Sequence, residues 1–599
     1  MLAGGNGLSA SASFVYKQGD TTSIYYNKVI FGGPKVGKVI SRADVASTPL
    51  VKRYFYSDIP APTDIGSNLP SLGGLLYNAN YKQYLKLPTP CSVYVTDDPA
   101  DPGIGINSSC TTDYYFFYSM YSNPLIGLYT FSSIPISYRS VYESYGENFE
   151  NGGIRHDFEV VQDQPALVIN GNRINGVSMD SYAWINGKET HTQTFKTNGE
   201  QFIPVQEVFT HYNTDTRKNK ITYSYTAEKV AQPRCDITIL PDDAVPYYNL
   251  NLNAIWQSWI YPDSVVTFTY DKNGTTRIAD TILTQYGNVS HAMPTAVTRT
   301  LSNGSRETQN MYYPDDLALA GQAETARQAL LNKHILSPVL YKNIMRGGAQ
   351  VYAQNTDYEV FNNAYPLPRT YSTQIRNSSV QKMSEFYKYD RYGKLLEQSK
   401  ENDVKQAFLW DYKNTYPIAQ VLNADSSSIA YTSFEADGTG GWTIAGSVRQ
   451  PGGITGALSY NPSSGSISRS GLVQANAYIV SYWRQVALAI SIPGTISGYP
   501  IQGKTVFKDG ISWTYFEHKI TGQSSVSISA PGTIDELRLY PATAQMNTYT
   551  YLPLVGTTSQ CDVGNKITYY EYDEMSREKV IRDQDGNVIK TIDYHYRAQ

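Results

Sequence analysis

Three aromatic side chains are the best candidates for binding chemistry, and they lie in a stretch of low charge between residues 431 and 540: Trp442, Trp513 and Tyr515. Sugar binding needs flat aromatic faces with a few polar neighbours, and these rings could supply them. The alternative is core packing, which we expect for Trp483 in the middle of an apolar run. The sequence leaves both interpretations open for the first three rings.

Catalytic side chains give no comparable signal. The seven histidines are dispersed and form neither an HExxH nor a His-x-His motif, and no GxSxG nucleophile motif occurs. Carboxylate pairs that hydrolyse glycosidic bonds meet in space rather than in sequence, so the sequence leaves that chemistry open. On this balance we expect the protein not to be an enzyme.

The chain has four cysteines, which are too few for a disulfide scaffold and lack the CxxC spacing of a zinc site. Cys91 and Cys110 flank a loop rich in Asp, Pro and Gly. In an oxidising compartment we expect these two to form a disulfide, and two unpaired thiols are the alternative.

The composition favours a mainly β protein. Of 599 residues 41% are hydrophobic and only 17% are charged, against about 25% charged in an ordinary soluble domain. The 52 Tyr outnumber the 18 Phe, which suits broad, half-buried sheets because a phenol packs its ring and leaves its hydroxyl in water. A net charge of −4 argues against nucleic acid or an anionic membrane as partner. No segment reaches the 18 or so apolar residues of a membrane span.

One pattern recurs along the chain: aromatic-x-Tyr-Asp-x-x-Gly/Ser. It occurs at 387–394 and 570–577, with a weaker copy at 268–274. Two aromatics two residues apart point to one face of a strand, and the Asp with a small residue then turns the chain back. Each copy therefore predicts a β-hairpin.

Turn signals predict further hairpins. Asp583-Gln584-Asp585-Gly586-Asn587 separates two alternating runs, which favours a hairpin turn over a calcium loop. Asn-Gly pairs suit type I′ turns and occur at 186–187, 198–199, 273–274 and 303–304. Short alternating runs between residues 12 and 60 predict a meander of four strands. The one convincing helix is the Ala-rich segment 322–334, which we expect to lie across a sheet.

These elements suggest four regions. We predict an N-terminal β-meander with long loops at 1–145, a β-hairpin array with the helix at 146–427, a β-sandwich at 428–545 and C-terminal hairpins at 546–599. The repeat pattern resumes after the sandwich, which therefore looks inserted into the array. Insertion at a hairpin tip costs little, because loop-closure entropy grows slowly with length.

The Tyr-Asp repeat, the DxDGN turn and the ending Ile592-Asp593-Tyr594-His595-Tyr596 resemble the YD-repeat (Rhs-like) proteins, in particular large surface proteins of Bacteroidota. The resemblance is specific over 380–599. It implies an extracellular array of β-hairpins that forms a shell, fibre or scaffold, generally without catalytic residues in the repeats.

Within the predicted sandwich, the start (Ser433 to Glu435 and Gly441-Trp442), the middle (Val480 to Trp483) and the end (Ile534 to Leu539) resemble galactose-binding-like jelly rolls, which include carbohydrate-binding modules. Related modules often hold a structural Ca²⁺ between a Glu on the first strand and an Asp on the last, positions that Glu435 and Asp535 match. Two carboxylates fall short of the six to eight ligands of Ca²⁺ unless backbone carbonyls contribute. The alternative is two carboxylates at strand ends. No other cofactor is expected.

Three functions fit these patterns. The leading one is a non-enzymatic extracellular or outer-membrane cell-surface scaffold that displays the jelly roll and binds other surface or secreted proteins. The second is a carbohydrate-binding surface protein that recognises glycans through 428–545. The third is a fragment of a polymorphic toxin shell or of a type IX secretion carrier. The N-terminal residues do not resemble a signal peptide, so we expect the chain to be part of a longer protein.

Overall fold

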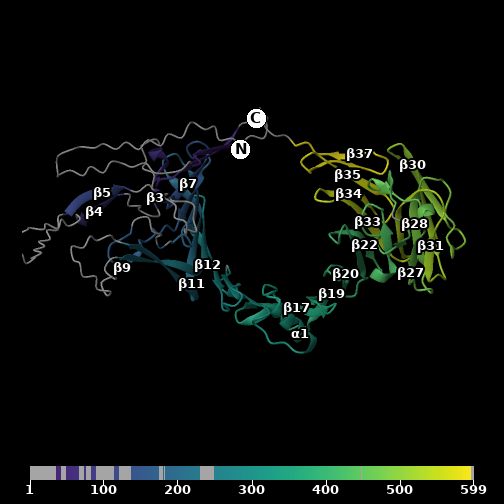
Figure 1. Ribbon diagram of the computed structural model, residues 1–599, viewed down its shortest axis with the longest axis horizontal. Coiled ribbons are helices and arrows are strands. Elements are labelled where there is room, and N and C mark those ends of the chain that lie inside the picture. Colours follow the sequence, from purple (N-terminus) through teal and green to yellow (C-terminus); the bar gives the residue numbers. More distant parts are fainter. Residues whose placement is uncertain are drawn as a thin grey trace, which may run out of the picture. The chain divides into compact units, whose positions relative to one another are not determined.

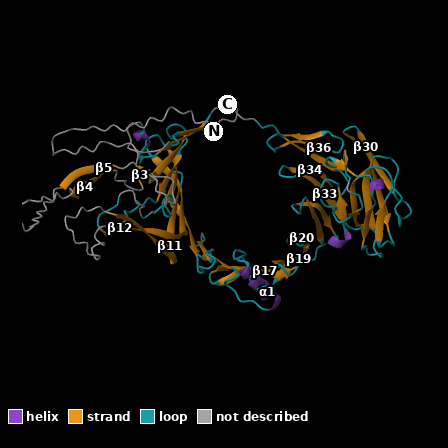
Figure 2. Ribbon diagram, viewed as in Figure 1, coloured by secondary structure: helices purple, strands orange, loops and turns teal. Residues whose placement is uncertain are grey.

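The computed structural model describes residues 35–41, 49–65, 73–75, 82–88, 114–120, 136–174, 180, 182–229, 248–301, 303–446 and 448–594. The chain divides into two compact units, Met1–Leu283 and Thr284–Gln599. Strands dominate both units (Figures 1 and 2), and the described residues contain one α-helix. The predicted mainly β fold with one short helix is confirmed.

The strands of the first unit are β1 Lys38–Ser41, β2 Leu50–Phe55, β3 Gly73–Leu75, β4 Lys82–Pro88, β5 Tyr114–Met120, β6 Ile136–Tyr138, β7 Ser140–Tyr145, β8 Gly153–Phe158, β9 Leu167–Asn170, β10 Glu189–Thr197, β11 Phe202–Lys229, β12 Tyr248–Tyr270 and β13 Arg277–Gln285. An antiparallel ladder runs β1-β2-β7-β8-β10-β11-β12-β13. The predicted boundary at residue 145 lies within this ladder. Of the predicted N-terminal meander, β1 and β2 are present, and the runs before residue 35 lie outside the described residues.

The second unit contains what we call the array: β14 Ala296–Thr300, β15 Arg306–Tyr312, β16 Tyr341–Arg346, β17 Ala349–Phe361, β18 Tyr365–Ile375, β19 Gln381–Tyr389, β20 Leu395–Lys400, β21 Gln406–Asp411, β22 Tyr416–Leu422, β33 Gln545–Leu552, β34 Gly556–Cys561, β35 Ile567–Tyr572, β36 Glu578–Arg582 and β37 Val588–Thr591. Each strand pairs antiparallel with the next. Because β22 pairs directly with β33, the ladder continues across the residues between them.

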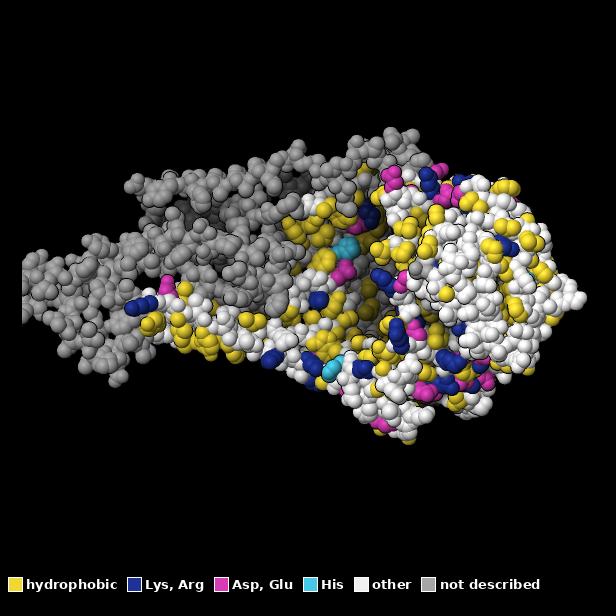
Figure 3. All heavy atoms as spheres, turned by 45° about the vertical axis from the view of Figure 1, so that its right-hand side comes forward, with side chains coloured by type: hydrophobic (Ala, Val, Ile, Leu, Met, Phe, Trp, Pro, Cys, Tyr) yellow, Lys and Arg dark blue, Asp and Glu magenta, His cyan; other side chains and the backbone are white. Residues whose placement is uncertain are grey.

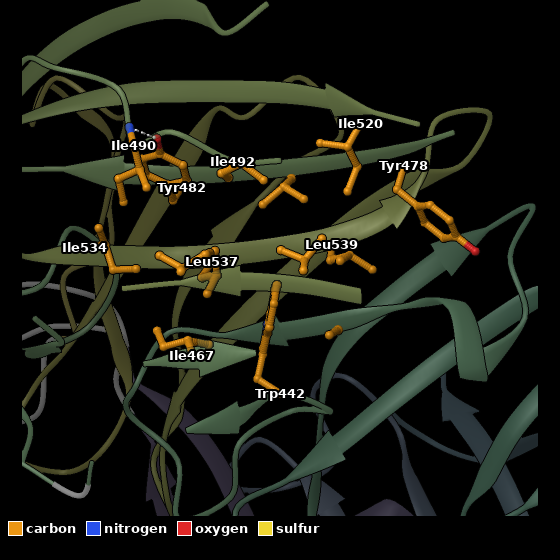
Figure 4. Close-up of a cluster of buried hydrophobic side chains, with 14 of the residues drawn as sticks. Trp442, Ile467, Tyr478, Tyr482, Ile490, Ile492, Ile520, Ile534, Leu537 and Leu539 are labelled. Atoms are coloured by element: carbon orange, nitrogen blue, oxygen red, sulfur yellow. Dashed lines mark hydrogen bonds between the residues drawn. The ribbon is translucent and has the colours of Figure 1, made fainter. Parts of the chain in front are cut away.

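Those intervening residues form what we call the sandwich: β23 Ala430–Thr432, β24 Thr443–Ile444, β25 Gln450–Pro451, β26 Leu458–Ser459, β27 Ile467–Ser470, β28 Tyr478–Arg484, β29 Ile501–Lys508, β30 Ile511–Ile520, β31 Ser525–Ile528 and β32 Ile534–Pro541. One sheet runs β23-β32-β28-β30-β29 and a second runs β24-β27-β31. Side chains of both sheets share one apolar core (Figure 4), in which Trp442 and Ile467 face Leu537 and Leu539.

The helix α1, Gly321–Asn332, matches the predicted one. Its Ala326 and Leu330 are buried, and it packs against β17 and β18, so the expectation that it lies across a sheet is confirmed. Among the described residues, no helix is both long and apolar enough to cross a bilayer.

The repeat corners form the predicted hairpins. At the first corner, one carboxylate oxygen of Asp390 accepts hydrogen bonds from the backbone amides of Tyr392 and Lys394, both at 2.8 Å. Gly393 takes the left-handed conformation with φ +82°, which glycine adopts without a Cβ clash. Asp573 caps the equivalent corner between β35 and β36 in the same way. Asp583 caps the β36–β37 turn likewise, so the DxDGN segment is a hairpin turn, as expected.

The Asn-Gly pairs do not form the predicted type I′ turns. A type I′ turn needs positive φ at both central residues, but at 198–199 and 273–274 only Gly199 (φ +95°) and Gly274 (φ +72°) have it. At the second site the Asp271 carboxylate caps the amides of Asn273 and Thr275, which widens the turn beyond two residues. The pair at 186–187 joins no strand pair, because the Asn186 side chain binds the backbone of Val161 instead.

Candidate functional site

Several array strands carry a Tyr or Trp whose hydroxyl or indole N–H donates a hydrogen bond to a backbone carbonyl of the preceding strand in the ladder. We call each of these hydrogen bonds a tie. At each tie the preceding strand has a β-bulge, and the ring donates to a carbonyl oxygen at that irregularity. The donors and acceptors are Tyr389 to Pro368 at 2.7 Å, Trp410 to Leu395 at 2.8 Å, Tyr551 to Pro417 at 2.9 Å and Tyr572 to Thr557 at 2.9 Å. A bulge disrupts the ladder locally, so the ring supplies a donor that the strand cannot. The Tyr of the Tyr-Asp pattern is therefore a cross-strand tie.

One of these ties spans the sandwich. Tyr551 on β33 and Pro417 on β22 are 134 residues apart in sequence, yet they make the same contact as neighbouring repeats. The Tyr551 ring also stacks on Tyr416, with 4.7 Å between ring centroids, and burial raises the pKa of Tyr551 to about 12. The array thus resumes its repeat geometry where the sandwich ends.

The sandwich is fixed to the array by two apolar clusters. In the first, Tyr431, Ile479 and Tyr540 of the sandwich pack with array residues that include Ile418 and Val421. The second cluster combines sandwich residues with two array residues, Cys561 and Ile567. Its sandwich members are Ile454, Trp483, Val506, Trp513 and Tyr515. We call this contact region the junction.

Arg538 on β32 lies in the junction and is 1% exposed. Its guanidinium donates to Glu536 Oε1 at 2.8 Å and to Thr548 Oγ1 of the array at 2.7 Å. It also donates to the Asp562 carbonyl at 3.2 Å and to Asn565 Oδ1 at 3.1 Å. Burial by itself lowers the pKa of Arg538, but nearby Cys561 and Glu536 outweigh it and hold that pKa above its usual value. Arg538 therefore connects the sandwich to strand β33 of the array and to the turn between β34 and β35.

Two more carboxylate contacts complete this buried polar centre. The Tyr431 hydroxyl donates to Glu536 Oε2 at 2.7 Å, and burial followed by the Glu536 charge raises the pKa of Tyr431 well above its usual value. Asp535 accepts from the Thr455 amide at 2.8 Å, and burial with the neighbouring Glu536 raises the pKa of Asp535 well above normal. Buried charges need such partners, because an unpaired one is strongly destabilising.

The rings predicted to bind sugar lie in the interior. Trp442 is 3% exposed in the sandwich core, and Trp513 and Tyr515 are 0% and 9% exposed in the junction. Trp483 is buried, as expected. None of the three candidate rings presents an open face, so of the two interpretations left open by the sequence the burial favours core packing over sugar binding. Their apolar area instead holds the core and the junction together.

The two carboxylates suggested for Ca²⁺ bind backbone amides. Glu435 accepts from the amides of Ala457 and Leu458, and Asp535 accepts from the amide of Thr455. Burial raises the pKa of Glu435. Within the described part of the chain, no three His, Cys, Asp or Glu side chains are grouped to hold a metal ion. With Glu435 Oε1 and both oxygens of Asp535 bound to backbone amides, these residues do not fit the oxygen cage that Ca²⁺ needs.

Neither half of the predicted Cys91–Cys110 disulfide can be placed, because both residues lie outside the described ranges. Cys561 is a free, buried thiol in the junction. Burial raises its pKa, so it behaves as a small apolar side chain rather than a nucleophile.

A row of polar side chains crosses the first unit. The Ser140 hydroxyl donates to Asp157, whose other oxygen lies 2.8 Å from His191 Nδ1, and the Tyr270 hydroxyl donates to Glu207 farther along. A serine nucleophile would need its hydroxyl on the histidine, as in a Ser-His-Asp arrangement. Here the serine binds the carboxylate instead, so the row ties strands β7, β8, β10, β11 and β12 together.

Sequence reasoning missed the junction, although one signal was present. The run Asp535-Glu536-Leu537-Arg538-Leu539 carries three charges, and all of β32 before its last residue is buried. Charged residues are almost never fully buried unless paired. Three of them in a strand with an otherwise apolar character therefore indicate an internal ion pair.

No family model matches the chain, and no curated protein matches it. Matching solved structures include the crystal structure of TcdB2-TccC3-TEV, at 8% identity and a TM-score of 0.19, covering 75% of this chain and 20% of that chain. Another is TcdB2-TccC3 without its hypervariable C-terminal region, at 10% identity and a TM-score of 0.16, covering 76% of this chain and 28% of that one. The chain thus spans less than a third of the length of either matched chain. Similarity at this level carries no argument about fold or function.

Proposed function

We propose that the chain is a non-enzymatic structural scaffold, a YD-repeat-type hairpin array whose sandwich is a fixed part of the body. The observation that carries the proposal is the junction. Trp513 and Tyr515, the rings that a displayed binding module would turn outward, belong to one buried cluster with Cys561 and Ile567 of the array. Arg538 adds hydrogen bonds from the sandwich to Thr548 and Asn565.

The contacts between sandwich and array favour a sandwich held rigidly on the array over a sandwich displayed as a mobile binding module. Two domains of one chain are expected to move relative to each other unless the interface between them is large and hydrophobic. Here two apolar clusters and the hydrogen bonds of the buried Arg538 to Thr548 and Asn565 join sandwich and array. On the face of the sandwich in Figure 3, uncharged side chains dominate and charged ones are few. A body of this kind suits a wall or stalk.

Native-state hydrogen exchange of the full chain tests this proposal. We expect the amides of β28 and β30 in the sandwich to exchange through the same opening as those of β34 and β35 in the array, with equal free energies and equal denaturant dependence. A sandwich that opens alone at lower denaturant would contradict the fixed-body proposal. Saccharide binding by the full chain on a glycan array, or hydrolysis of a glycan by it, would contradict the rest.

The proposal includes a place and a class of partner: the cell surface or extracellular space, with other surface or secreted proteins. It is supported by the low charged fraction of 17% and by the 52 Tyr residues, which build polar surface without charge. Labelling of intact cells with a membrane-impermeant amine reagent tests the location, and crosslinking afterwards tests the class of partner.

A role as a toxin shell or a type IX carrier is a special case of this proposal. It would be distinguished by recovery of an enclosed cargo or of a secretion component with the chain.

A further inference from the structure

The loop between β25 and β26 is held by charged side chains of three other segments. Its amides face two carboxylates, because Thr455 N donates to Asp535 at 2.8 Å and Ala457 N donates to Glu435 at 2.8 Å. The Gly456 backbone has φ +74°, and a Cβ there would lie 2.4 Å from the Glu435 carboxyl carbon. The loop is therefore moulded closely around these carboxylates.

Two backbone carbonyls of the same loop accept hydrogen bonds from a lysine side chain of the sandwich. Lys508 Nζ, at the end of β29, donates to the Gly453 carbonyl at 2.8 Å and to the Gly456 carbonyl at 2.6 Å. The ammonium also lies 5.3 Å from the centre of the Tyr569 ring, within cation–π range. Tyr569 belongs to the array, and its hydroxyl donates to the Ile454 carbonyl at 2.9 Å. Loop, sandwich and array thus meet at this ammonium.

We propose that the Lys508 ammonium is the built-in cation of this loop, bound by the loop carbonyls that a metal ion would otherwise need, so that the junction is independent of calcium. An ammonium has three protons to donate and no fixed coordination geometry, so two carbonyls and an aromatic face satisfy it. Calcium needs six to eight oxygens at about 2.3–2.6 Å. Backbone amides already bind Glu435 Oε1 and both carboxylate oxygens of Asp535, which leaves too few oxygens for such a shell.

The first test uses the wild-type full chain and calcium alone. We expect the melting temperature to be the same in excess chelator and in millimolar Ca²⁺, to within about 1 °C, because a ligand that does not bind the native state cannot shift unfolding. Sensitised luminescence of Tb³⁺ should likewise show no saturable site. A saturable rise in melting temperature with Ca²⁺, lost on chelation, would overturn the proposal.

The second test removes the ammonium. Lys508→Met keeps the length and apolar stem of the side chain but leaves the two loop carbonyls without their donor. We expect its melting temperature to fall by about 4–8 °C, because the cooperative unit loses two hydrogen bonds of a half-buried ammonium. Lys504→Met is the matched control, since Lys504 lies on the same strand and pairs with Asp585 at the surface. Equal melting temperatures for the two variants would overturn the proposal, and the wild-type titration stands even if Lys508→Met fails to fold.

Discussion

The array and the sandwich are both antiparallel β structure, but they are stabilised in different ways. In the array each strand depends on its neighbours, through backbone ladders, Asp caps and ring-to-carbonyl ties that recur from hairpin to hairpin. In the sandwich, side chains from strands far apart in sequence share one core. The free energy of unfolding of the array should therefore be close to a sum of contributions from neighbouring strands. The strands of the sandwich, in contrast, should unfold together in one cooperative transition.

The junction is where the two kinds of structure become one. Its cluster around Trp513 contains sandwich and array residues in a single apolar contact, and Arg538 places a charge between them. A perturbation at the junction should therefore lower the stability of both regions directly, a perturbation in the sandwich core should lower it throughout the sandwich and reach the array through the junction, and a perturbation at one corner should stay at that corner. These three expectations can be tested in order of size.

The largest effect should come from Arg538→Met. It leaves Glu536 charged, buried and without its ion-pair partner, which should destabilise the protein by about 3–5 kcal/mol. Equilibrium unfolding in urea measures it. Because the arginine connects both regions, the unfolding of sandwich and array should move together.

The control for this variant is Arg582→Met, which breaks the Glu571 ion pair at the array surface and should be nearly neutral. The double variant Glu536→Gln with Arg538→Met removes the unpaired charge and should recover much of the lost stability. If Arg538→Met unfolds the sandwich and leaves the array at wild-type stability, the junction does not couple the two.

The next effect concerns pH and belongs to the sandwich. Its core contains His518, which bonds Tyr482 and Thr495 at 3.1 Å each. Burial lowers the pKa of His518 from 6.5 to about 4. Between these values the unfolded chain binds a proton that the folded chain does not, so stability is complete above pH 6.5 and falls as pH drops toward 4. The difference is on the order of 3 kcal/mol.

His518→Gln isolates this contribution, because glutamine keeps hydrogen-bonding groups but does not titrate. We expect the unfolding free energies of wild type and variant to converge as pH falls from 6.5 toward 4. Urea titrations at several pH values measure the difference. Parallel curves would show that His518 does not titrate in this range.

A smaller effect should come from single ties in the array. Tyr551→Phe and Tyr572→Phe each remove the donor to one bulge carbonyl and should cost about 1–2 kcal/mol. Tyr549→Phe on the same strand is the control, since its hydroxyl has no hydrogen bond to any described residue. Equal losses of unfolding free energy for the two variants would show that the tie across the sandwich is equivalent to a tie between neighbouring hairpins. A much larger loss for Tyr551→Phe would show that the tie across the sandwich stabilises the protein more than the others do.

The array could be predicted from sequence because its determinants are local. An aromatic-x-Tyr-Asp run and a Gly or Ser three residues after the Asp fix a corner within eight residues, and the structure has hairpins at 387–394 and 570–577. The helix was equally local. The Asn-Gly turn at 273–274 was not predicted correctly because the carboxylate of Asp271, two residues earlier, binds the amides of the turn.

The candidate site could not be predicted, because burial is decided by contacts distant in sequence. Nothing near Trp513 indicates that it will share a buried cluster with Cys561, and nothing near Glu435 indicates that the loop amides will bind it. A Trp in a strand looks the same in sequence whether it faces solvent or a partner sheet. The strand with Asp535, Glu536 and Arg538 is the exception that could have been recognised from sequence, since charged residues in a buried apolar strand need partners inside the protein.

The smallest expected effect is at a single corner. Asp390→Ala removes the acceptor for the amides of Tyr392 and Lys394 and should cost about 0.5–1.5 kcal/mol. Asp390→Asn keeps an acceptor and is the matched control. Because each hairpin contacts mainly its neighbours, hydrogen exchange should quicken at residues 390–394 and leave β28 and β35 unchanged. Faster exchange throughout the sandwich would mean that even a solvated corner is coupled to the distant core, and the contrast between a locally built array and a collectively built sandwich would then fail.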